Sequence, residues 1–299
     1  MAEENKKKHH RGRRKKKGGS NIVSNIILVI AIVVFAVSAY KLYGIFSEYN
    51  KGDKEYQKIQ DLVINTDKKD DTKEETFSVD FEKLLEMNSD VVGWIRFDEP
   101  SEINYPVVQG RDNEEYLKRT FEANTNKLGT LFVDVNNPGD FSGRNTFIYG
   151  HNMKNGSMFA QLLKYKDDSF YKEHPYFYIY TPDGKVRTYE IFSAGVVKDT
   201  SDSYIMDYAD DAAFQTYIDY IKQQSAYPTS AEVTTASKIV SLSTCTNVRD
   251  DERFFGAWRD DQRRSGKIGR GKIMADMYEV GDVVRLKKSI HAAVLSGKY

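Results

Sequence analysis

A single thiol is the first candidate for chemistry in this sequence. Cys245 is the only cysteine among the 299 residues, and it ends the strand-like run that begins at residue 239. As the N-terminal sequence discussed below predicts, this segment should lie outside the cell, in an oxidising compartment. A lone thiol there has no disulfide partner and is exposed to oxidation. We therefore interpret Cys245 as a nucleophile, with a buried and chemically inert cysteine as the alternative.

An imidazole is the usual helper of such a thiol, because the free pKa of cysteine is about 8.5 and only the thiolate is a good nucleophile. His151 directly follows the strand-like segment 147–150, so its ring would project from a strand-to-loop junction, as the thiol of Cys245 does. Taken alone, a structural or merely exposed histidine is the alternative. The remaining histidines lie in a basic N-terminal block, in a polar turn and near the C-terminus: His9, His10, His174 and His291.

A guanidinium is the third candidate group. If the thiolate attacks an amide carbonyl, a fixed donor aimed at the developing oxyanion lowers the barrier by about 3 kcal/mol. Arginine suits this task because it stays charged and presents a fork of donors. We favour Arg253 because it immediately precedes the apolar run 254–258, which would form a strand beside the one that ends at Cys245. Arg249 is interpreted as a solvated loop residue.

Short strands must position these groups. Strand-like runs rich in β-branched and aromatic residues recur between turn signals, at residues 91–97, 105–108, 130–133, 146–149, 176–180 and 186–197. Pro182, Asp183 and Gly184 predict a hairpin turn between the last two runs. Helices are fewer in this part of the chain, and are expected at 79–87 and 209–226. Many strands without βαβ alternation predict a mainly β fold, an antiparallel barrel or sandwich.

The run at 239–245 alternates in character. Ser241, Ser243 and Cys245 share one face, while Val240, Leu242 and Thr244 share the other. The second face is expected to point into the core. The first face, with two hydroxyls that lead to a thiol, is expected to form the floor of a polar cleft.

The N-terminus predicts a membrane anchor. Residues 1–20 hold nine basic residues against two acidic ones, and residues 21–40 carry no charge and are mostly apolar. Such a run can cross about 30 Å of hydrocarbon, and the basic block should stay in the cytoplasm. We expect a cytoplasmic segment at 1–20 and a single transmembrane helix at 21–43, with everything after it outside the cell. A cleavable signal peptide is the alternative.

Three regions follow the expected anchor. Residues 44–76 predict a juxtamembrane helix followed by a charged, solvated linker. A folded domain is expected at 77–258, large enough for one good core. Residues 259–299 form an atypical extension, and the polar residues that follow Trp258 predict that the closing strand is truncated. If that strand fails, Arg253 would be poorly positioned.

Four ordered motifs together resemble the sortase family. They are Ser-Leu-Ser-Thr-Cys at 241–245, an arginine eight residues later, Tyr-Gly-His at 149–151, and Tyr-Pro-Val-Val-Gln-Gly at 105–110 with Asp112 and Asn113. A helix is expected at 209–226, inserted before the Cys245 strand, and this insertion resembles the arrangement in class B sortases. The resemblance covers residues 77–258. It implies an eight-stranded β-barrel with a few helices.

The resemblance also implies an activity. Sortases are cysteine transpeptidases on the outer face of Gram-positive membranes; they cleave a C-terminal sorting motif of a secreted protein after threonine. Cys245 would form the thioester, His151 would shuttle the proton, and Arg253 would hold the oxyanion. The acceptor would be an amine of peptidoglycan or its lipid-linked precursor. No metal, cofactor or nucleic-acid partner is expected.

Substrate contacts can be carried over from the family where positions match. The candidates are Asn113, Leu117, Thr200, Tyr204, Ile205 and Ser243, each of which could instead be a packing residue. Thr246 stands where some relatives have an acidic residue, so fine specificity is expected to differ. A catalytically weak, membrane-tethered domain that binds wall components or secreted partners remains the alternative function. A plain thiol protease is a further rival.

Overall fold

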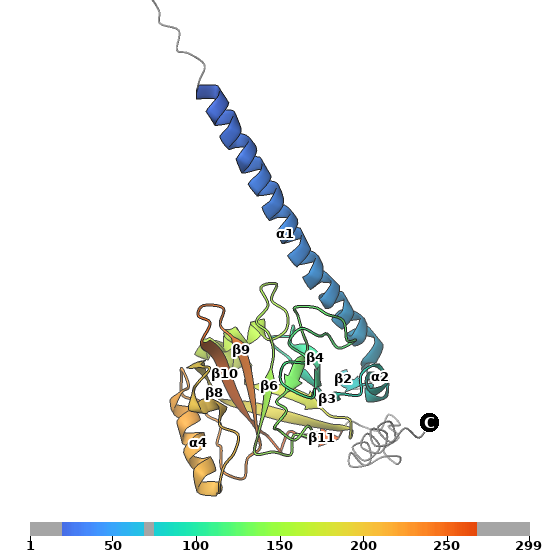
Figure 1. Ribbon diagram of the computed structural model, residues 1–299. Helices are drawn as coiled ribbons and strands as arrows, with labels where there is room; N and C mark the ends of the chain where they lie inside the picture. The colour runs from blue at the N-terminus through green and yellow to red at the C-terminus, as the bar shows by residue number, and fades with distance from the viewer. Residues whose placement is uncertain (1–19, 69–74, 268–299) are drawn as a thin grey trace, which may run out of the picture. The chain divides into compact units, whose positions relative to one another are not determined.

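The computed structural model describes residues 20–68 and 75–267 (Figure 1). The chain divides into two compact units, Met1–Glu48 and Tyr49–Tyr299. Helix α1 (Ser20–Val63) begins in the first unit and ends in the second. Within the described residues it is the one helix long and apolar enough to cross a membrane.

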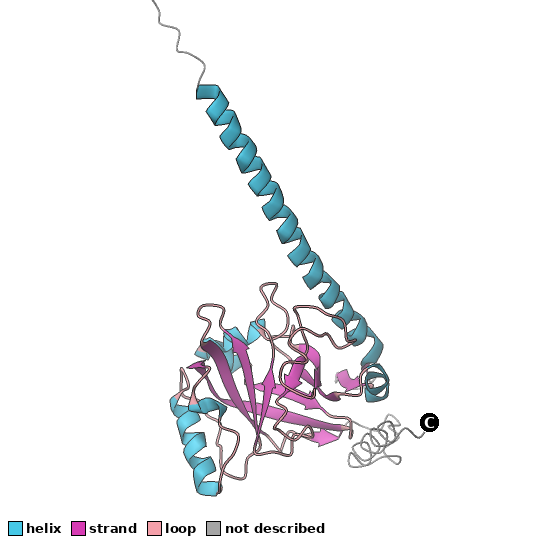
Figure 2. Ribbon diagram, viewed as in Figure 1, coloured by secondary structure: helices cyan, strands magenta, loops and turns pink. Residues whose placement is uncertain are grey.

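The second unit is built around a closed barrel (Figure 2). Its strands follow one another in the ring in the order β10-β9-β6-β5-β4-β3-β7-β8, and pairing between β8 and β10 closes it. A short strand, β11 (Gly266–Lys267), pairs with the start of β8. The eight-stranded, mainly β fold predicted from the sequence is confirmed. The barrel strands are β3 (Val91–Phe97), β4 (Asn104–Val108), β5 (Leu131–Val133), β6 (Asn145–Tyr149), β7 (Tyr176–Tyr180), β8 (Lys185–Lys198), β9 (Ile239–Cys245) and β10 (Glu252–Asp260).

Aromatic side chains fill the barrel interior. Trp258 lies edge-on to Phe177 at 5.3 Å between ring centroids, and Phe177 stacks on Phe97 at 4.9 Å. Such pairs add about 0.5–1.5 kcal/mol each beyond the area they bury. Val240 and Leu242 of β9 belong to this same buried cluster. The expected inward face of the Cys245 strand is therefore confirmed for these two residues.

The outer face of β9 is covered by helix α4 (Asp211–Gln223). Asp210 caps this helix by accepting from the amide of Ala213, and the apolar side of the helix packs over Ile239. Because that apolar side must be buried, Ser241 is fully covered, and its hydroxyl donates to Asn145 Oδ1 at 2.9 Å. The expectation of a polar cleft at Ser241 was wrong. The shorter helices are α2 (Phe81–Met87), η1 (Ala160–Lys166), α3 (Asp168–Glu173) and η2 (Asp202–Tyr204).

The juxtamembrane region is more ordered than the sequence predicts. The expected helix is the end of α1, and the expected linker contains the antiparallel pair β1 (Ile64–Lys68) and β2 (Glu75–Val79). The amide of Asp80 donates to the carbonyl of Val63 at 2.8 Å, which ties the end of α1 to the start of α2. Residues 69–74 between the two strands lie outside the described residues.

The last turns of α1 belong to the same folded unit as the barrel. Tyr56, Ile59 and Val63, spaced as one helical stripe, are almost completely buried in the main core cluster. The hydroxyl of Tyr56 donates to the carbonyl of Gly129 in the loop between β4 and β5. The folded unit therefore begins well before residue 77, where the sequence places the start of the domain.

The closing strand is complete. β10 runs two residues past Trp258 and pairs with β9 on one side and β8 on the other. Arg259 forms an ion pair with Glu190, its partner in the β8 ladder. The truncation expected after Trp258 is therefore not found, because these polar residues are paired along the ladder. The rest of the expected C-terminal extension, from residue 268, lies outside the described residues.

Candidate active site

Strand β9 lies between the two strands that bring the candidate groups to Cys245. On one side, the antiparallel ladder with β10 places Arg253 directly opposite Cys245. Residues opposite each other in such a ladder share a face, with Cβ atoms about 4.5–5.5 Å apart. On the other side, the parallel ladder with β6 ends at Tyr149 opposite Ser243. If that register continued by two residues, His151 would lie beside Cys245.

The chain after β6 does follow the end of β9. The amide of Gly150 donates to the carbonyl of Ser243 at 3.2 Å, and Asn152 Nδ2 donates to the carbonyl of Cys245 at 2.8 Å. Asn247 Nδ2 in turn donates to the carbonyl of Asn152 at 2.8 Å. The structure therefore brings the segments of the three predicted catalytic residues together at one end of β9.

Strand β9 is buried along its length and becomes partly exposed only at its last residue. Cys245 is half-buried, whereas the six residues before it are buried. Tyr204 covers this end, with its hydroxyl 2.7 Å from the hydroxyl of Ser243 and its ring edge-on to Phe255. Burial raises the pKa of Tyr204 to about 12, so the phenol stays neutral. Cys245 also raises this pKa and Arg253 lowers it, which puts both groups within electrostatic range of Tyr204.

The ring of His151 is oriented by a backbone carbonyl. His151 Nε2 lies 2.7 Å from the carbonyl oxygen of Leu117. A carbonyl can only accept a hydrogen bond, so Nε2 carries a proton in this arrangement. In the neutral ring the other nitrogen, Nδ1, is then the proton acceptor. Leu117, predicted as a substrate contact, thus supports His151 with its backbone and leaves its side chain 37% exposed.

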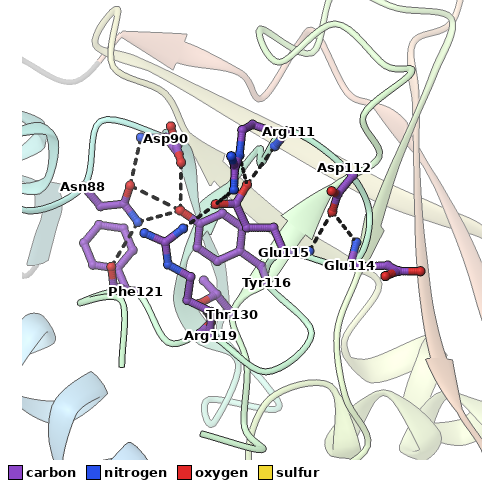
Figure 3. A network of polar contacts seen from close by, with 10 residues as sticks. All are labelled: Asn88, Asp90, Arg111, Asp112, Glu114, Glu115, Tyr116, Arg119, Phe121 and Thr130. Carbon is purple, nitrogen blue, oxygen red and sulfur yellow. Dashed lines mark hydrogen bonds and ion pairs between the residues drawn. The ribbon is translucent and has the colours of Figure 1, made fainter. Parts of the chain in front are cut away.

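The loop that carries Leu117 joins β4 to β5 and is held by a polar network (Figure 3). Tyr116 donates its hydroxyl to Asp90 at 2.9 Å, and Asn88 donates to the carbonyl of Phe121 at 3.0 Å. Glu115 accepts from both Arg111 and Arg119. These contacts involve residues on both sides of Leu117 in the sequence. They hold the loop in place and thereby fix the position of the Leu117 carbonyl that contacts His151.

A buried carboxylate links this loop to the His151 strand. Asp134 is 3% exposed, and its Oδ2 accepts from Asn113 Nδ2 at 2.9 Å and from the hydroxyl of Tyr149 at 3.1 Å. Asn113 Oδ1 accepts the amide of Val135 at 2.9 Å. The side chain of Asn113 is thus used within the protein. Sequence reasoning missed Asp134 and Tyr149 as supports, although Tyr149 lies within the Tyr-Gly-His motif.

The guanidinium of Arg253 is tethered at the open end of the barrel. Nη1 donates to the carbonyls of Asp250 and Glu252 at 2.6 and 3.0 Å, and Nη2 lies 3.3 Å from Asp199 Oδ2. The Asp199 side chain is 41% exposed. Such solvent-exposed ion pairs contribute about 0–1 kcal/mol, so the guanidinium can leave Asp199 at little cost. Asp199 was not singled out from the sequence.

The other predicted contacts lie between β8 and α4. Thr200 is exposed on the loop that follows β8, next to Asp199, and the side chain of Ile205 is 44% exposed just after η2. Of the predicted contacts in this segment, Tyr204 reaches β9 through its hydrogen bond with Ser243. Across residues 20–68 and 75–267, no group of three or more His, Cys, Asp or Glu side chains is arranged to hold a metal ion.

Comparison with known proteins identifies the family. The sortase domain model matches residues 99–255. Sortase B of Listeria monocytogenes is 37% identical over 172 residues, which cover 57% of this chain and 68% of that protein. Sortase B of Staphylococcus aureus is 33% identical over 221 residues, which cover 74% and 87%.

Solved structures agree with this assignment. A Staphylococcus aureus sortase B-substrate complex superposes with a TM-score of 0.57 at 29% identity, covering 63% of this chain and 85% of that one. A sortase B complexed with triglycine superposes with a TM-score of 0.56 at 31% identity, covering 63% and 86%. Sequence motifs, barrel topology and these relatives agree, and the chain belongs to the class B sortases, a family of cysteine transpeptidases.

Proposed function

We propose that this transpeptidase cleaves a sorting motif after threonine through a thioester on Cys245. The Sγ thiolate attacks the threonine carbonyl carbon, the C–N bond of the next residue breaks, and the acyl group stays on sulfur. An amine of peptidoglycan or its precursor then attacks the thioester and releases the thiol. One observation carries this proposal: Cys245 ends β9 with Arg253 opposite on β10 and the His151 segment alongside.

His151 serves as the proton shuttle in this scheme. The Leu117 carbonyl keeps a proton on Nε2, so the proton exchanged with substrate is carried on Nδ1. As imidazolium, the ring protonates the leaving amine; as neutral imidazole, it takes a proton from the incoming amine. One residue in two protonation states therefore serves both halves of the reaction.

Arg253 stabilises the oxyanion of both tetrahedral intermediates. Its facing position across the ladder from Cys245 supports this role, as does the weak, exposed nature of its contact with Asp199. The substrate carbonyl would replace Asp199 as the partner of Nη2. A delocalised fork of donors suits an oxyanion that forms close to a sulfur nucleophile.

The substrate would lie across the end of β9, between the β4–β5 loop and the segment before α4. Leu117 and Ile205 offer exposed apolar side chains for this contact. We extend the proposed contacts to Thr200, Tyr204 and Ser243, and to Asn113, whose side chain also bonds to Asp134 and Val135. Relatives solved with a substrate and with triglycine support a peptide donor and an amine acceptor in general. Helix α1 would anchor the enzyme, with residues 1–20 in the cytoplasm.

The test uses the full chain in detergent with a panel of fluorogenic sorting peptides and a triglycine acceptor. We expect cleavage and a triglycine-linked product, both lost in Cys245→Ala, and a hydroxamate product when hydroxylamine replaces triglycine. Hydrolysed product alone, with acceptor in excess, would indicate a thiol protease instead. Peptide or wall binding without cleavage, retained in Cys245→Ala, would indicate the catalytically weak binding domain.

A further inference from the structure

We propose that the side-chain amides of Asn152 and Asn247 form a clasp of two hydrogen bonds that sets the separation of His151 from Cys245. Asn152 Nδ2 donates to the carbonyl of Cys245, and Asn247 Nδ2 donates to the carbonyl of Asn152, both at 2.8 Å. The two side chains thus join the residue after His151 to Cys245 itself and to the chain beyond it. They are positioning residues, and the inference rests on the proposed roles of His151 and Cys245.

The clasp begins where the backbone ladder stops. The parallel pairing of β6 with β9 ends at Tyr149 opposite Ser243, and the last backbone bond runs from Gly150 to Ser243. His151 and Cys245 come immediately afterwards, where both chains leave the sheet. Backbone pairing therefore no longer fixes their separation, and side-chain amides take over that task.

Both asparagines are themselves held in place. Asn152 forms a β-bridge with Met158, and the amide of Phe159 donates to the carbonyl of His151 at 2.9 Å, so the loop folds back on itself. Asn247 has φ of 59°, a left-handed conformation that asparagine adopts more readily than most residues. Each amide therefore projects from a defined backbone, and the pair acts as a strut between two loops.

The rate of acyl transfer depends on the separation of His151 and Cys245 that this clasp sets. A misplacement of about 1 Å between reacting groups can cost about a hundredfold in rate, even when substrate binding is unchanged. We expect Asn152→Ala and Asn247→Gly each to lower kcat by about tenfold to a hundredfold with little change in KM. Glycine is chosen at 247 because it keeps the positive φ and removes only the amide.

A matched control lies on the same loop. Asn155 also donates its amide to a remote segment, to Asp53 at 2.8 Å, and its other hydrogen bonds are with Ser157 rather than with Cys245 or Asn247. Asn155→Ala should leave kcat within about twofold of wild type. The double variant Asn152→Ala/Asn247→Gly should lose at least as much kcat as the worse single variant, because each single change leaves the other hydrogen bond in place.

A second readout does not depend on peptide turnover. In a His151→Cys background the full chain in detergent is oxidised, and the rate of disulfide formation with Cys245 reports the separation of the two positions. We expect Asn152→Ala and Asn247→Gly to slow this crosslink at least fivefold, and Asn155→Ala to leave it unchanged.

The two readouts separate the clasp from the proposed reaction. If wild type cleaves no peptide but the crosslink slows as expected, the reaction is refuted and the clasp stands. A crosslink that is no faster with both asparagines than without them overturns the clasp. So does a loss of kcat in Asn155→Ala equal to that in the clasp variants.

Discussion

Arg253 and Arg249 show how position decides the use of the same side chain. Both follow Cys245 within eight residues, yet only Arg253 faces it across a ladder, while Arg249 pairs with Glu252 and its side chain is 69% exposed. The apolar run after Arg253 favours this residue over Arg249, and that run does form β10. The sequence does not predict the register that places Arg253 opposite Cys245, because this register depends on the length and path of the turn between β9 and β10.

This contrast gives a matched pair of variants. Arg253→Ala is expected to lower kcat by about a hundredfold to a thousandfold, because an oxyanion donor is lost. Arg253→Lys should recover only part of this loss, since an ammonium lacks the fork of donors. Arg249→Ala removes the same charge from the same turn and should change kcat less than twofold. The measurement is steady-state transpeptidation, with a thermal melt of each variant; equal losses for both arginines would contradict the assignment.

The strands were predictable at the scale of elements because each carries its own alternation. Residues 91–97, 176–180 and 239–245 were expected as strands and are β3, β7 and β9 with the same bounds. The short helices η1 and α3 are not predicted from the sequence, since a few residues of 3₁₀ or α structure leave too short a segment for a periodic pattern. The burial of the last turns of α1 was also missed, because the surface that covers them is formed by distant loops.

This burial gives a prediction for the end of α1. Ile59 is fully buried and Leu62, three residues later, is 46% exposed. Ile59→Ala should lower the free energy of unfolding by about 2–5 kcal/mol, from lost transfer energy and the cavity left behind. Leu62→Ala should change it by less than about 0.5 kcal/mol. Denaturant titration of the full chain in detergent measures both; a similar loss at the two sites would show that this stripe does not face the core.

At the scale of the whole molecule, tyrosines with raised pKa values lower the folding stability at alkaline pH. Burial raises the pKa of Tyr105, Tyr116, Tyr204 and Tyr208 to about 12, from an ordinary value of 10. A phenol whose folded pKa is raised ionises more readily in the unfolded chain. Its contribution to stability is therefore complete below pH 10 and is lost as pH rises from about 10 to about 12.

The expected result is a melting temperature that falls steeply above about pH 10. Absorbance of phenolate at 295 nm should rise together with unfolding for the buried tyrosines, after an earlier step from exposed ones. Tyr204→Phe removes one contributor and should make the fall shallower. A melting temperature that stays flat to pH 12 would mean that these phenols are accessible in the folded state.

The closing strand has a consequence for how the enzyme is made. Among the described residues β10 is the last barrel strand, and it must pair with both β8 and β9 to complete the ring. A polypeptide emerging from the ribosome has Cys245 before it has the arginine that faces it. Until synthesis passes residue 260 the ring stays open, so a nascent chain that already carries Cys245 cannot yet complete the site around it.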